Sequence, residues 1–260
     1  MQALGIELTP VWNHRERGQG RRPFSHFHNV QPIAATCREH GLEYDARPRH
    51  RGRDPLLFLD FRVARRRVLA ASAGLSVLNL FAYTCGIGVC ASAGGASEVL
   101  NVDFAESALC IGEENASRNG LGDGFQTLQE DVIPVIRQFS GLGVRWRGRR
   151  APRFMKLAPR AWDLVVLDPP RWAKGRFGAV DVVRDYASLL KPALLATKPG
   201  GAVLATNNVA SVDRDDWLSS VRRCGDKAGR PVADIEIIEP EADWPSPDGR
   251  PPLKIAWISV

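Results

Sequence analysis

The stretch Ser76-Val-Leu-Asn-Leu-Phe-Ala-Tyr-Thr-Cys-Gly-Ile-Gly88 decides the fold of this chain of 260 residues. It opens with an apolar run, Val77–Tyr83, which predicts one buried strand. Small residues follow and predict a helix over 86–94. A buried strand that passes through a glycine-containing turn into a helix is typical of an α/β protein. In such sheets ligands bind beyond the carboxyl ends of the strands, so this turn is the first place to look for a functional site.

Toward the C-terminus the same alternation repeats, and we expect one α/β domain over residues 74–260. The predicted strands after the first are 98–102, 125–129, 163–167, 202–206, 232–238 and 253–260. The predicted helices are 105–118, a segment ending at 139, 179–196 and 213–228. Strands that alternate with helices predict a parallel sheet covered on both faces. No clear helix separates the last two strands, so the sheet should be mostly parallel and seven-stranded, with an antiparallel C-terminal hairpin.

Toward the N-terminus the pattern is weaker, and we treat residues 1–73 as an extension. A short helix is predicted over 30–40. The short strands 42–45 and 56–61 predict a β-hairpin with a basic tip, and 62–74 has the composition of a helix.

Positive charge is concentrated in two segments of a chain whose net charge is +6. Residues 46–67 carry +6 and residues 143–160 carry +7, so the other residues together carry −7. A basic surface on an otherwise acidic protein predicts a polyanionic partner, most simply nucleic acid. The alternative is a solvated arginine-rich surface without a partner.

Several classes are disfavoured. The five cysteines form no C-x-x-C pair, which favours a reducing compartment such as the cytoplasm and disfavours a disulfide framework. His26 and His28 lack neighbouring ligand residues, so we expect no metal site. No apolar run is long enough to cross a membrane, and Met1–Gly5 does not resemble the start of a secretory signal.

Carboxylates follow the ends of the next three predicted strands. Asp103 could accept hydrogen bonds from both hydroxyls of a ribose, and Glu130-Asp131 could accept one from the amino group of adenine. Asp168 follows the next strand. Asp103 and Asp131 could instead be helix N-caps, which are common after a strand.

The segment Asp168-Pro-Pro-Arg-Trp172 combines several features of a ligand site. Two prolines fix the backbone, Arg171 supplies a cation, and Trp172 supplies a face on which a base can stack. Trp172 could instead belong to the core, and Gly86 and Gly88 could serve only close packing.

Together these motifs resemble class I S-adenosylmethionine-dependent methyltransferases, and in particular the bacterial large-subunit ribosomal RNA methyltransferases that methylate cytosine C5 or guanine N7. The resemblance extends from about Gly41 to the end and rests on the segments 58–62, 78–84, 102–103, 130–131, 168–172, 198–201 and 243–245 with Tyr186. It implies a Rossmann-like methyltransferase fold and S-adenosyl-L-methionine as cofactor.

The resemblance also assigns roles to individual residues. It implies that Tyr83, Thr84 and Gly86 line the methionine part of the cofactor. Asp103 would then hold the ribose, Asp131 the adenine and Asp168 the region of the transferred methyl group. The residues implied to contact the target base are Pro169, Pro170, Arg171 and Trp172. Cys85 stands where the family usually has glycine, which would narrow the pocket.

The position of the cysteines favours one reaction. Cytosine C5 is a poor nucleophile that needs a thiolate to add at C6, and no cysteine lies between 111 and 223. The segment Thr206-Asn-Asn208 resembles the relatives that methylate guanine N7. We therefore expect methylation of a base nitrogen in ribosomal RNA, with guanine N7 favoured, and we expect Asp168 and Asn207 to orient the base near Trp172. An adenine-N6 target ranks lower because Arg171 separates the prolines from the aromatic residue.

Other functions remain open at this point. The same cofactor could serve a protein or small-molecule substrate, since a fold does not fix a function. A non-catalytic RNA-binding protein could use the same scaffold. A nicotinamide dehydrogenase is disfavoured because G-x-G-x-x-G is absent. If the partner is RNA, the two arginine-rich segments would follow its phosphate backbone, and binding should weaken with salt.

Overall fold

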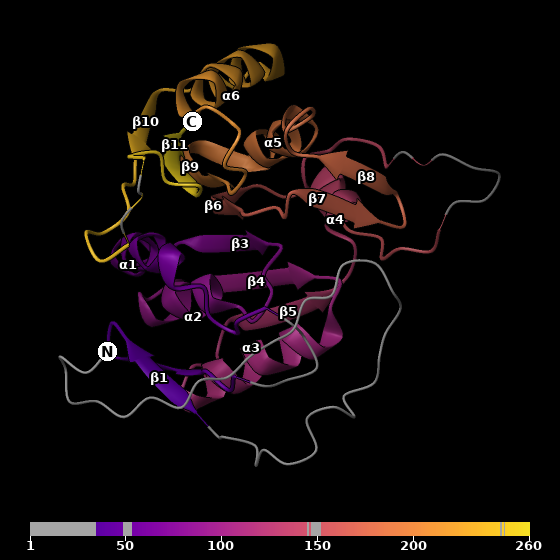
Figure 1. Ribbon diagram of the computed structural model, residues 1–260. Coiled ribbons are helices and arrows are strands. Elements are labelled where there is room, and N and C mark those ends of the chain that lie inside the picture. Colours follow the sequence, from indigo (N-terminus) through magenta and orange to yellow (C-terminus); the bar gives the residue numbers. More distant parts are fainter. Residues whose placement is uncertain (1–34, 49–53, 145, 147–151, 245, 247) are drawn as a thin grey trace, which may run out of the picture.

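The computed structural model describes residues 35–48, 54–144, 146, 152–244, 246 and 248–260 (Figure 1). A seven-stranded sheet forms its centre, in the order β10-β11-β9-β6-β3-β4-β5. Its strands are β3 (Ser76–Leu80), β4 (Glu98–Asp103), β5 (Phe125–Gln129), β6 (Trp162–Leu167), β9 (Thr197–Asn207), β10 (Asp234–Ile237) and β11 (Lys254–Ser259). Neighbours from β5 to β9 are parallel, whereas β11 is antiparallel to both β9 and β10. The predicted sheet with its antiparallel C-terminal hairpin is thus confirmed.

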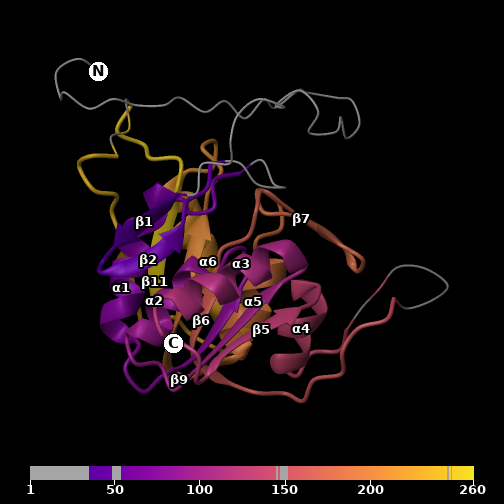
Figure 2. The same ribbon diagram turned by 90° about the horizontal axis from the view of Figure 1, so that it is seen from below.

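Six α-helices of the described residues cover this sheet (Figures 1 and 2). They are α1 (Arg62–Ala71), α2 (Gly86–Ala93), α3 (Glu106–Arg118), α4 (Val132–Phe139), α5 (Ala187–Leu195) and α6 (Arg214–Ala228). Alternate side chains of a strand point to opposite faces of the sheet, as β6 illustrates. Leu164 and Val166 pack with α1 and α2, whereas Val165 and Leu167 pack with α4, α5 and α6. The apolar runs of the sequence therefore form the sheet, which is the middle layer between two layers of helices.

The strand order places the first strand of the domain at a topological switch point. From β3 the chain moves outward through β4 to β5 and then returns to β6 on the other side of β3. Leu80 and Leu167 pair side by side at the carboxyl ends of β3 and β6. Loops that leave this point diverge to the two sides, which is where open α/β sheets bind ligands.

The N-terminal region contains a β-hairpin, but not the one expected from the sequence. β1 (Thr36–Glu39) pairs with β2 (Leu42–Asp45), so the predicted helix over 30–40 is wrong where the structure describes it. His40 and Gly41 both have positive φ, at 52° and 81°, which allows a tight hairpin turn. The predicted strand 56–61 is also wrong, because Leu59–Phe61 form a short 3-10 helix, η3. Most of the expected basic tip, at 49–53, lies outside the described residues.

Two asparagines, Asn115 of α3 and its C-cap Asn119, attach this hairpin to the domain. Asn119 accepts from the backbone N–H of Glu43 and donates to its carbonyl, both at 2.8 Å. Asn115 accepts from the N–H of Asp45 at 2.7 Å and donates to the carbonyl of Thr84 at 3.4 Å. Asn115 is buried, and its two hydrogen bonds join the hairpin to the loop that follows β3.

The predicted helix 179–196 begins later than expected. A second hairpin, β7 (Trp172–Gly175) and β8 (Gly178–Asp181), precedes α5. Gly178 has a φ of 130°, which favours glycine, and the Asp181 carboxylate accepts from the N–H of Val183 at 3.0 Å. A side chain that bonds the backbone locally competes with helix formation. Residues 198–201, one of the segments that carry the family resemblance, are part of β9.

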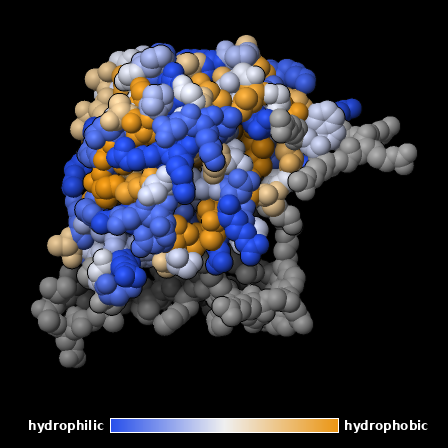
Figure 3. All heavy atoms as spheres, turned by 90° about the horizontal axis from the view of Figure 1, so that it is seen from above, coloured by the Kyte–Doolittle hydropathy of each residue, from blue (hydrophilic) through white to orange (hydrophobic). Residues whose placement is uncertain are grey.

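The face seen from above carries both hydrophilic and hydrophobic residues (Figure 3). In the view from above, toward α6, hydrophobic residues lie in separate patches between hydrophilic ones (Figure 3). Among the described residues, no helix combines the length and hydropathy needed to span a bilayer.

Candidate active site

The loop after β3 has an unusual backbone. Phe81, Tyr83 and Cys85 have φ values of 58°, 49° and 58°, in the left-handed region. Each such conformation costs a residue with a side chain about 1–2 kcal/mol. The strand therefore ends at Leu80 rather than at Tyr83 as predicted, and the strained loop faces the switch point. Strain of this kind persists where the surroundings fix it, and it clusters at functional sites.

Cys85 occupies a position whose conformation suits glycine. Its left-handed backbone favours glycine, and its fully buried side chain packs beside Gly112 of α3. A Cβ added at Gly112 would lie 2.4 Å from the Cys85 Sγ. The thiol is thus enclosed with Ala82 and Leu109, and the expected narrowing of the cofactor pocket stays a prediction.

Thr84 and Tyr83 hold the segment 54–58 over this loop. The Thr84 hydroxyl donates to the carbonyl of Leu56 at 2.5 Å and is buried. The Tyr83 hydroxyl donates to the carbonyl of Asp54 at 3.4 Å, and its ring centroid lies 6.0 Å from that of Phe58. The Thr84 hydroxyl proton is therefore already used within the chain. Gly86 opens α2, and its missing Cβ leaves room for Leu57, which a Cβ would approach to 3.3 Å.

Asp103 ends β4 and clamps the strained loop. One carboxylate oxygen accepts from the N–H of Tyr83 and the other from the N–H of Ala105, both at 2.9 Å. Burial raises the pKa of Asp103, and these backbone donors oppose the rise. A carboxylate has about four lone-pair positions, so two remain for the hydroxyls of a ribose.

Asp131 divides its two oxygens between two roles. Oδ1 caps α4 by accepting from the N–H of Ile133 at 2.9 Å, as the N-cap alternative predicted. Oδ2 is buried and has no hydrogen-bond partner among the described residues. Gly175 of the β7–β8 hairpin lies against it, since a Cβ on Gly175 would sit 1.7 Å from Oδ2. A buried acceptor without a partner is costly and is the feature expected where a ligand donor binds.

Asp168 lies at the carboxyl end of β6 and is linked to β9. The Thr206 hydroxyl donates to Asp168 Oδ1, and the Tyr186 hydroxyl donates to the Thr206 carbonyl at 2.9 Å. Burial raises the pKa of Asp168 to about 6; the Thr206 hydrogen bond lowers it and the charge of Asp60 raises it. Asp168 is therefore ionised at neutral pH but close to its titration point.

Asn207, next to Thr206, is also buried. Its Oδ1 accepts from the N–H of Val209 at 3.0 Å, while its Nδ2 has no partner among the described residues. Buried unpaired polar atoms thus occur at the ends of both β5 and β9, in Asp131 and Asn207.

The residues predicted to contact the target base follow Asp168 directly. Pro169 is buried, whereas Pro170 and Arg171 are exposed. Trp172 begins β7 and is 57% exposed, so the interpretation as a core residue is wrong. An exposed tryptophan at the edge of the site is available for stacking.

Three residues near Asp168 received no role from the sequence. Asp60 of η3 affects the pKa of Asp168, Thr206 bonds it, and Tyr186 supports Thr206. All three lie in segments quoted for the family resemblance, namely 58–62, Tyr186 and 206–208. Their proximity to Asp168 is visible only in the structure.

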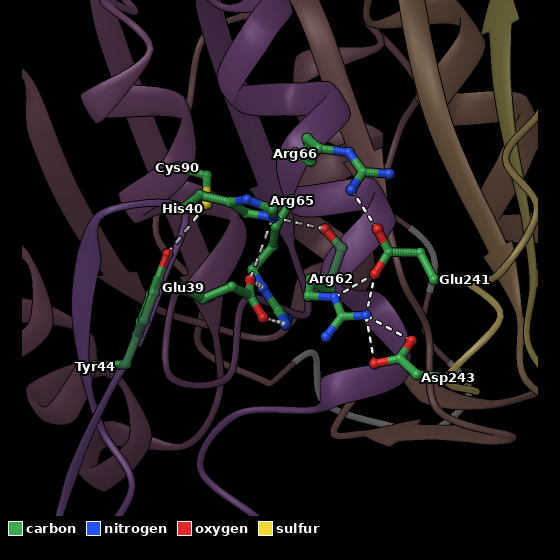
Figure 4. Close-up of polar contacts among 9 residues, drawn as sticks. All are labelled: Glu39, His40, Tyr44, Arg62, Arg65, Arg66, Cys90, Glu241 and Asp243. Atoms are coloured by element: carbon green, nitrogen blue, oxygen red, sulfur yellow. Dashed lines mark hydrogen bonds and ion pairs between the residues drawn. The ribbon is translucent and has the colours of Figure 1, made fainter.

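The first arginine-rich segment is largely engaged within the chain (Figure 4). Arg62 forms a bidentate pair with Asp243 at 2.7 and 2.8 Å and also pairs with Glu241, which Arg66 shares. The remaining pairs are Arg65 with Glu39, Arg67 with Glu236 and Arg47 with Asp45. The described part of 46–67 therefore offers less free positive charge than its sequence predicts.

No group of three or more candidate metal ligands occurs among the described residues. The site instead consists of carboxylates and backbone at successive ends of parallel strands. A sheet of this order, with carboxylates after β4, β5 and β6 around a switch point, defines the class of Rossmann-like methyltransferases. The chain belongs to the S-adenosylmethionine-dependent methyltransferase family, whose model matches residues 30–255.

Similar proteins agree with this assignment. The chain is 33% identical to a ribosomal RNA large subunit methyltransferase from Deinococcus radiodurans over 74% of its own length and 44% of that protein. It is 30% identical to ribosomal RNA large subunit methyltransferase I from Aeromonas hydrophila over 72% of its length and 44% of that protein. The chain thus spans less than half the length of these relatives.

Solved structures support the fold. SMU.776 complexed with SAH has a TM-score of 0.73 and 22% identity, covering 89% of this chain and 57% of that one. A SAM-dependent methyltransferase from Agrobacterium tumefaciens has a TM-score of 0.63 and 20% identity, covering 88% and 70%.

The residues present fit S-adenosylmethionine. The unpaired Asp131 Oδ2 needs a donor, which the amino group of adenine provides. Asp103 keeps lone pairs for ribose hydroxyls at the end of the neighbouring strand, β4. Asp168 retains an oxygen that Thr206 does not bond. These are the residues that the sequence selected for adenine, ribose and methyl group, and their contacts with the cofactor stay predictions.

Proposed function

We propose that this chain methylates a base nitrogen of ribosomal RNA, with guanine N7 favoured. The names of its relatives support the RNA class. The observation that carries the choice of atom is the polar set Asp168, Thr206 and Asn207 at the ends of β6 and β9, which contains no thiol. An rRNA substrate also places the activity in the cytoplasm, as the cysteine content predicts.

No cysteine of the described residues belongs to this set: Cys37 lies in β1, and Cys110 is exposed on α3. Cys85 and Cys90 are fully buried, and burial raises the pKa of both thiols, that of Cys90 to about 11. Cys224 is buried on α6, where its Sγ contacts the carbonyl of Ala187 at 4.0 Å. Addition of a thiolate to cytosine C6 therefore has no suitable group here, whereas a ring nitrogen with an in-plane lone pair needs none.

Catalysis then depends on position and environment. S-adenosylmethionine supplies a methyl group on a positively charged sulfur, and no base is needed when guanine N7 accepts it. The chain must hold the purine in line and exclude water. Asp168, fixed by Thr206, offers its second oxygen to N–H donors of guanine, and its negative charge favours the positive charge that the purine gains. The unpaired Nδ2 of Asn207 offers a donor to a ring or carbonyl acceptor.

Trp172 and Arg171 would contact the base at the edge of the site. Both are exposed directly after the two prolines. A base extruded from RNA loses its stacking, and an aromatic face restores part of it.

The first test is calorimetric titration with S-adenosylmethionine. Asp131→Asn keeps the N-cap oxygen and replaces the unpaired acceptor by a donor, so we expect about tenfold weaker binding. Asp213→Asn is the matched control, because Asp213 caps α6 in the same way by accepting from the N–H groups of Asp215 and Asp216. Equal affinity of both variants would contradict the adenine site at Asp131.

The second test identifies the product. We expect 7-methylguanosine when unmodified large-subunit rRNA is incubated with the protein and digested to nucleosides. Methyl transfer should fall as pH drops through about 6, where Asp168 takes up a proton, and Asp168→Asn should lose most of it. 5-Methylcytidine would refute the proposed atom. Absence of both cofactor binding and transfer would favour the non-catalytic RNA-binding alternative.

A further inference from the structure

A second site lies outside the strand ends, between the end of α4 and the segment 152–160. A groove of about 320 Å³ runs there. Its walls include Gln138, Leu142, Trp146, Phe154, Lys156 and Pro159. This volume is at the lower end of the range of small-molecule pockets, about 300–1,000 Å³.

The walls of the groove are fixed by hydrogen bonds. Gln138 of α4 donates to the carbonyl of Met155 and accepts from the N–H of Leu157, both at 3.0 Å. The Glu130 carboxylate accepts from the N–H of Met155 at 2.9 Å. On the other side, the Arg137 guanidinium donates to the carbonyl of Gly143 at 2.8 Å. The groove is therefore built on α4 and is not a gap in a loose loop.

Aromatic and cationic groups are combined inside it. Trp146 is 45% exposed. The Lys156 Nζ lies 4.1 Å from the centroid of the Phe154 ring. Aromatic faces with an adjacent ammonium group suit a flat base that carries a phosphate.

The groove is also connected to the methyltransferase site. Phe154 makes an edge-to-face contact with Phe177, at 5.3 Å between centroids. Phe177 lies in the turn of the β7–β8 hairpin, whose first residue is the exposed Trp172. Both the hairpin and the start of the segment lie beside β5 and α4, since Gly175 contacts Asp131 and Met155 contacts Glu130.

We propose that this groove binds an unpaired nucleotide of the RNA substrate next to the nucleotide that is methylated, with the base against Trp146 and Phe154 and a phosphate at Lys156. This rests on the proposed function and adds a second contact for the same RNA. Charge selects the partner: residues 143–160 contain seven Lys and Arg and no Asp or Glu, which fits a polyanion. Arg160 is engaged with Glu98 and the Trp162 ring, whereas Arg153 and Lys156 are exposed and have no ion pair among the described residues.

The test is fluorescence anisotropy with fluorescein-labelled oligo(U) of 20 nucleotides, which has little structure of its own. Trp146→Ala should weaken binding about tenfold, because it removes one stacking face. Lys156→Glu should weaken it and lower the slope of log affinity against log salt by about one. Trp244→Ala is the matched control, since Trp244 is 44% exposed and lies in the segment that bonds Arg62 rather than in the groove. Its affinity should be unchanged.

Calorimetry with S-adenosylmethionine separates the two proposals. We expect unchanged cofactor binding in Trp146→Ala and Lys156→Glu. If both variants bind oligo(U) like the control while methyl transfer continues, the proposal that the groove binds a nucleotide is refuted, and the proposed function stands. If Trp146→Ala is unfolded, Lys156→Glu decides alone. If poly-glutamate displaces oligo(U) as well as unlabelled RNA of equal charge does, the groove does not recognise bases and the inference is wrong.

Discussion

The two arginine-rich segments look alike in the sequence and differ in the structure. In the first, the described arginines meet carboxylates from distant parts of the chain, as with Arg62 and Asp243 (Figure 4). In the second, Arg160 pairs with Glu98, but Lys156 faces the Phe154 ring, and neither Arg153 nor Lys156 has an ion pair among the described residues. The net charge of a sequence segment counts its cations, but only the folded structure shows whether carboxylates elsewhere in the chain neutralise them. The first segment therefore contributes to stability, and the second is available to a polyanion.

The largest expected effect concerns the buried pair in the first segment. The side chains of Arg65 and Glu39 are 3% and 8% exposed and are joined by two hydrogen bonds. Arg65→Met would leave Glu39 buried without its partner, which typically costs about 3–5 kcal/mol of unfolding free energy. Arg66→Met is the control, because Arg66 is 54% exposed and should cost about 0–1 kcal/mol. Urea denaturation measures the unfolding free energy of both variants. Equal losses of unfolding free energy would contradict the structural role of the buried pair.

A smaller effect should separate the segments in RNA binding. Arg153→Ala with Lys156→Ala removes two exposed cations of the second segment, so the salt slope of oligo(U) binding should fall by about two. Arg66→Ala with Arg67→Ala removes two ion-paired cations of the first segment and should leave the slope nearly unchanged. Anisotropy at several salt concentrations gives both slopes. A larger change of the salt slope in Arg66→Ala with Arg67→Ala would contradict this difference between the two segments.

The smallest effect is a pH dependence of the first segment. The guanidinium groups of Arg66 and Arg62 hold the pKa of Glu241 below its usual value. A lowered pKa stabilises the fold at neutral pH, and this contribution is lost as pH falls through the folded-state pKa. Glu241→Gln should therefore melt below the wild type at pH 7, and the difference should shrink as the pH falls through the folded-state pKa of Glu241. The exposed Asp234→Asn serves as control, and a difference that persists in acid would exclude the ion pairs as its cause.

Much of the central sheet followed from the sequence, because buried strands and their helices have strong periodicity. Asp103, Asp131 and Asp168 could be chosen as candidates because each lies at or just beyond the end of a strand, and their roles stay predictions. The β1–β2 hairpin was missed since its turn, His40-Gly41, lies within a stretch that resembles a helix. The ion pairs of Arg62 and the bond from Thr206 to Asp168 join residues far apart in the chain, and no local pattern contains them. The acceptor left open at Asp131 likewise depends on the placement of Gly175.

Cys85 and Gly112 show how two distant positions become dependent on each other during divergence. A side chain larger than hydrogen is accommodated at Cys85 because Gly112 leaves space for its sulfur. Alanine at 112 is then admissible only when position 85 is glycine, so the order of the two substitutions matters. A double-mutant cycle on unfolding free energy should show this epistasis: Gly112→Ala alone should be harmful and Cys85→Gly should rescue it.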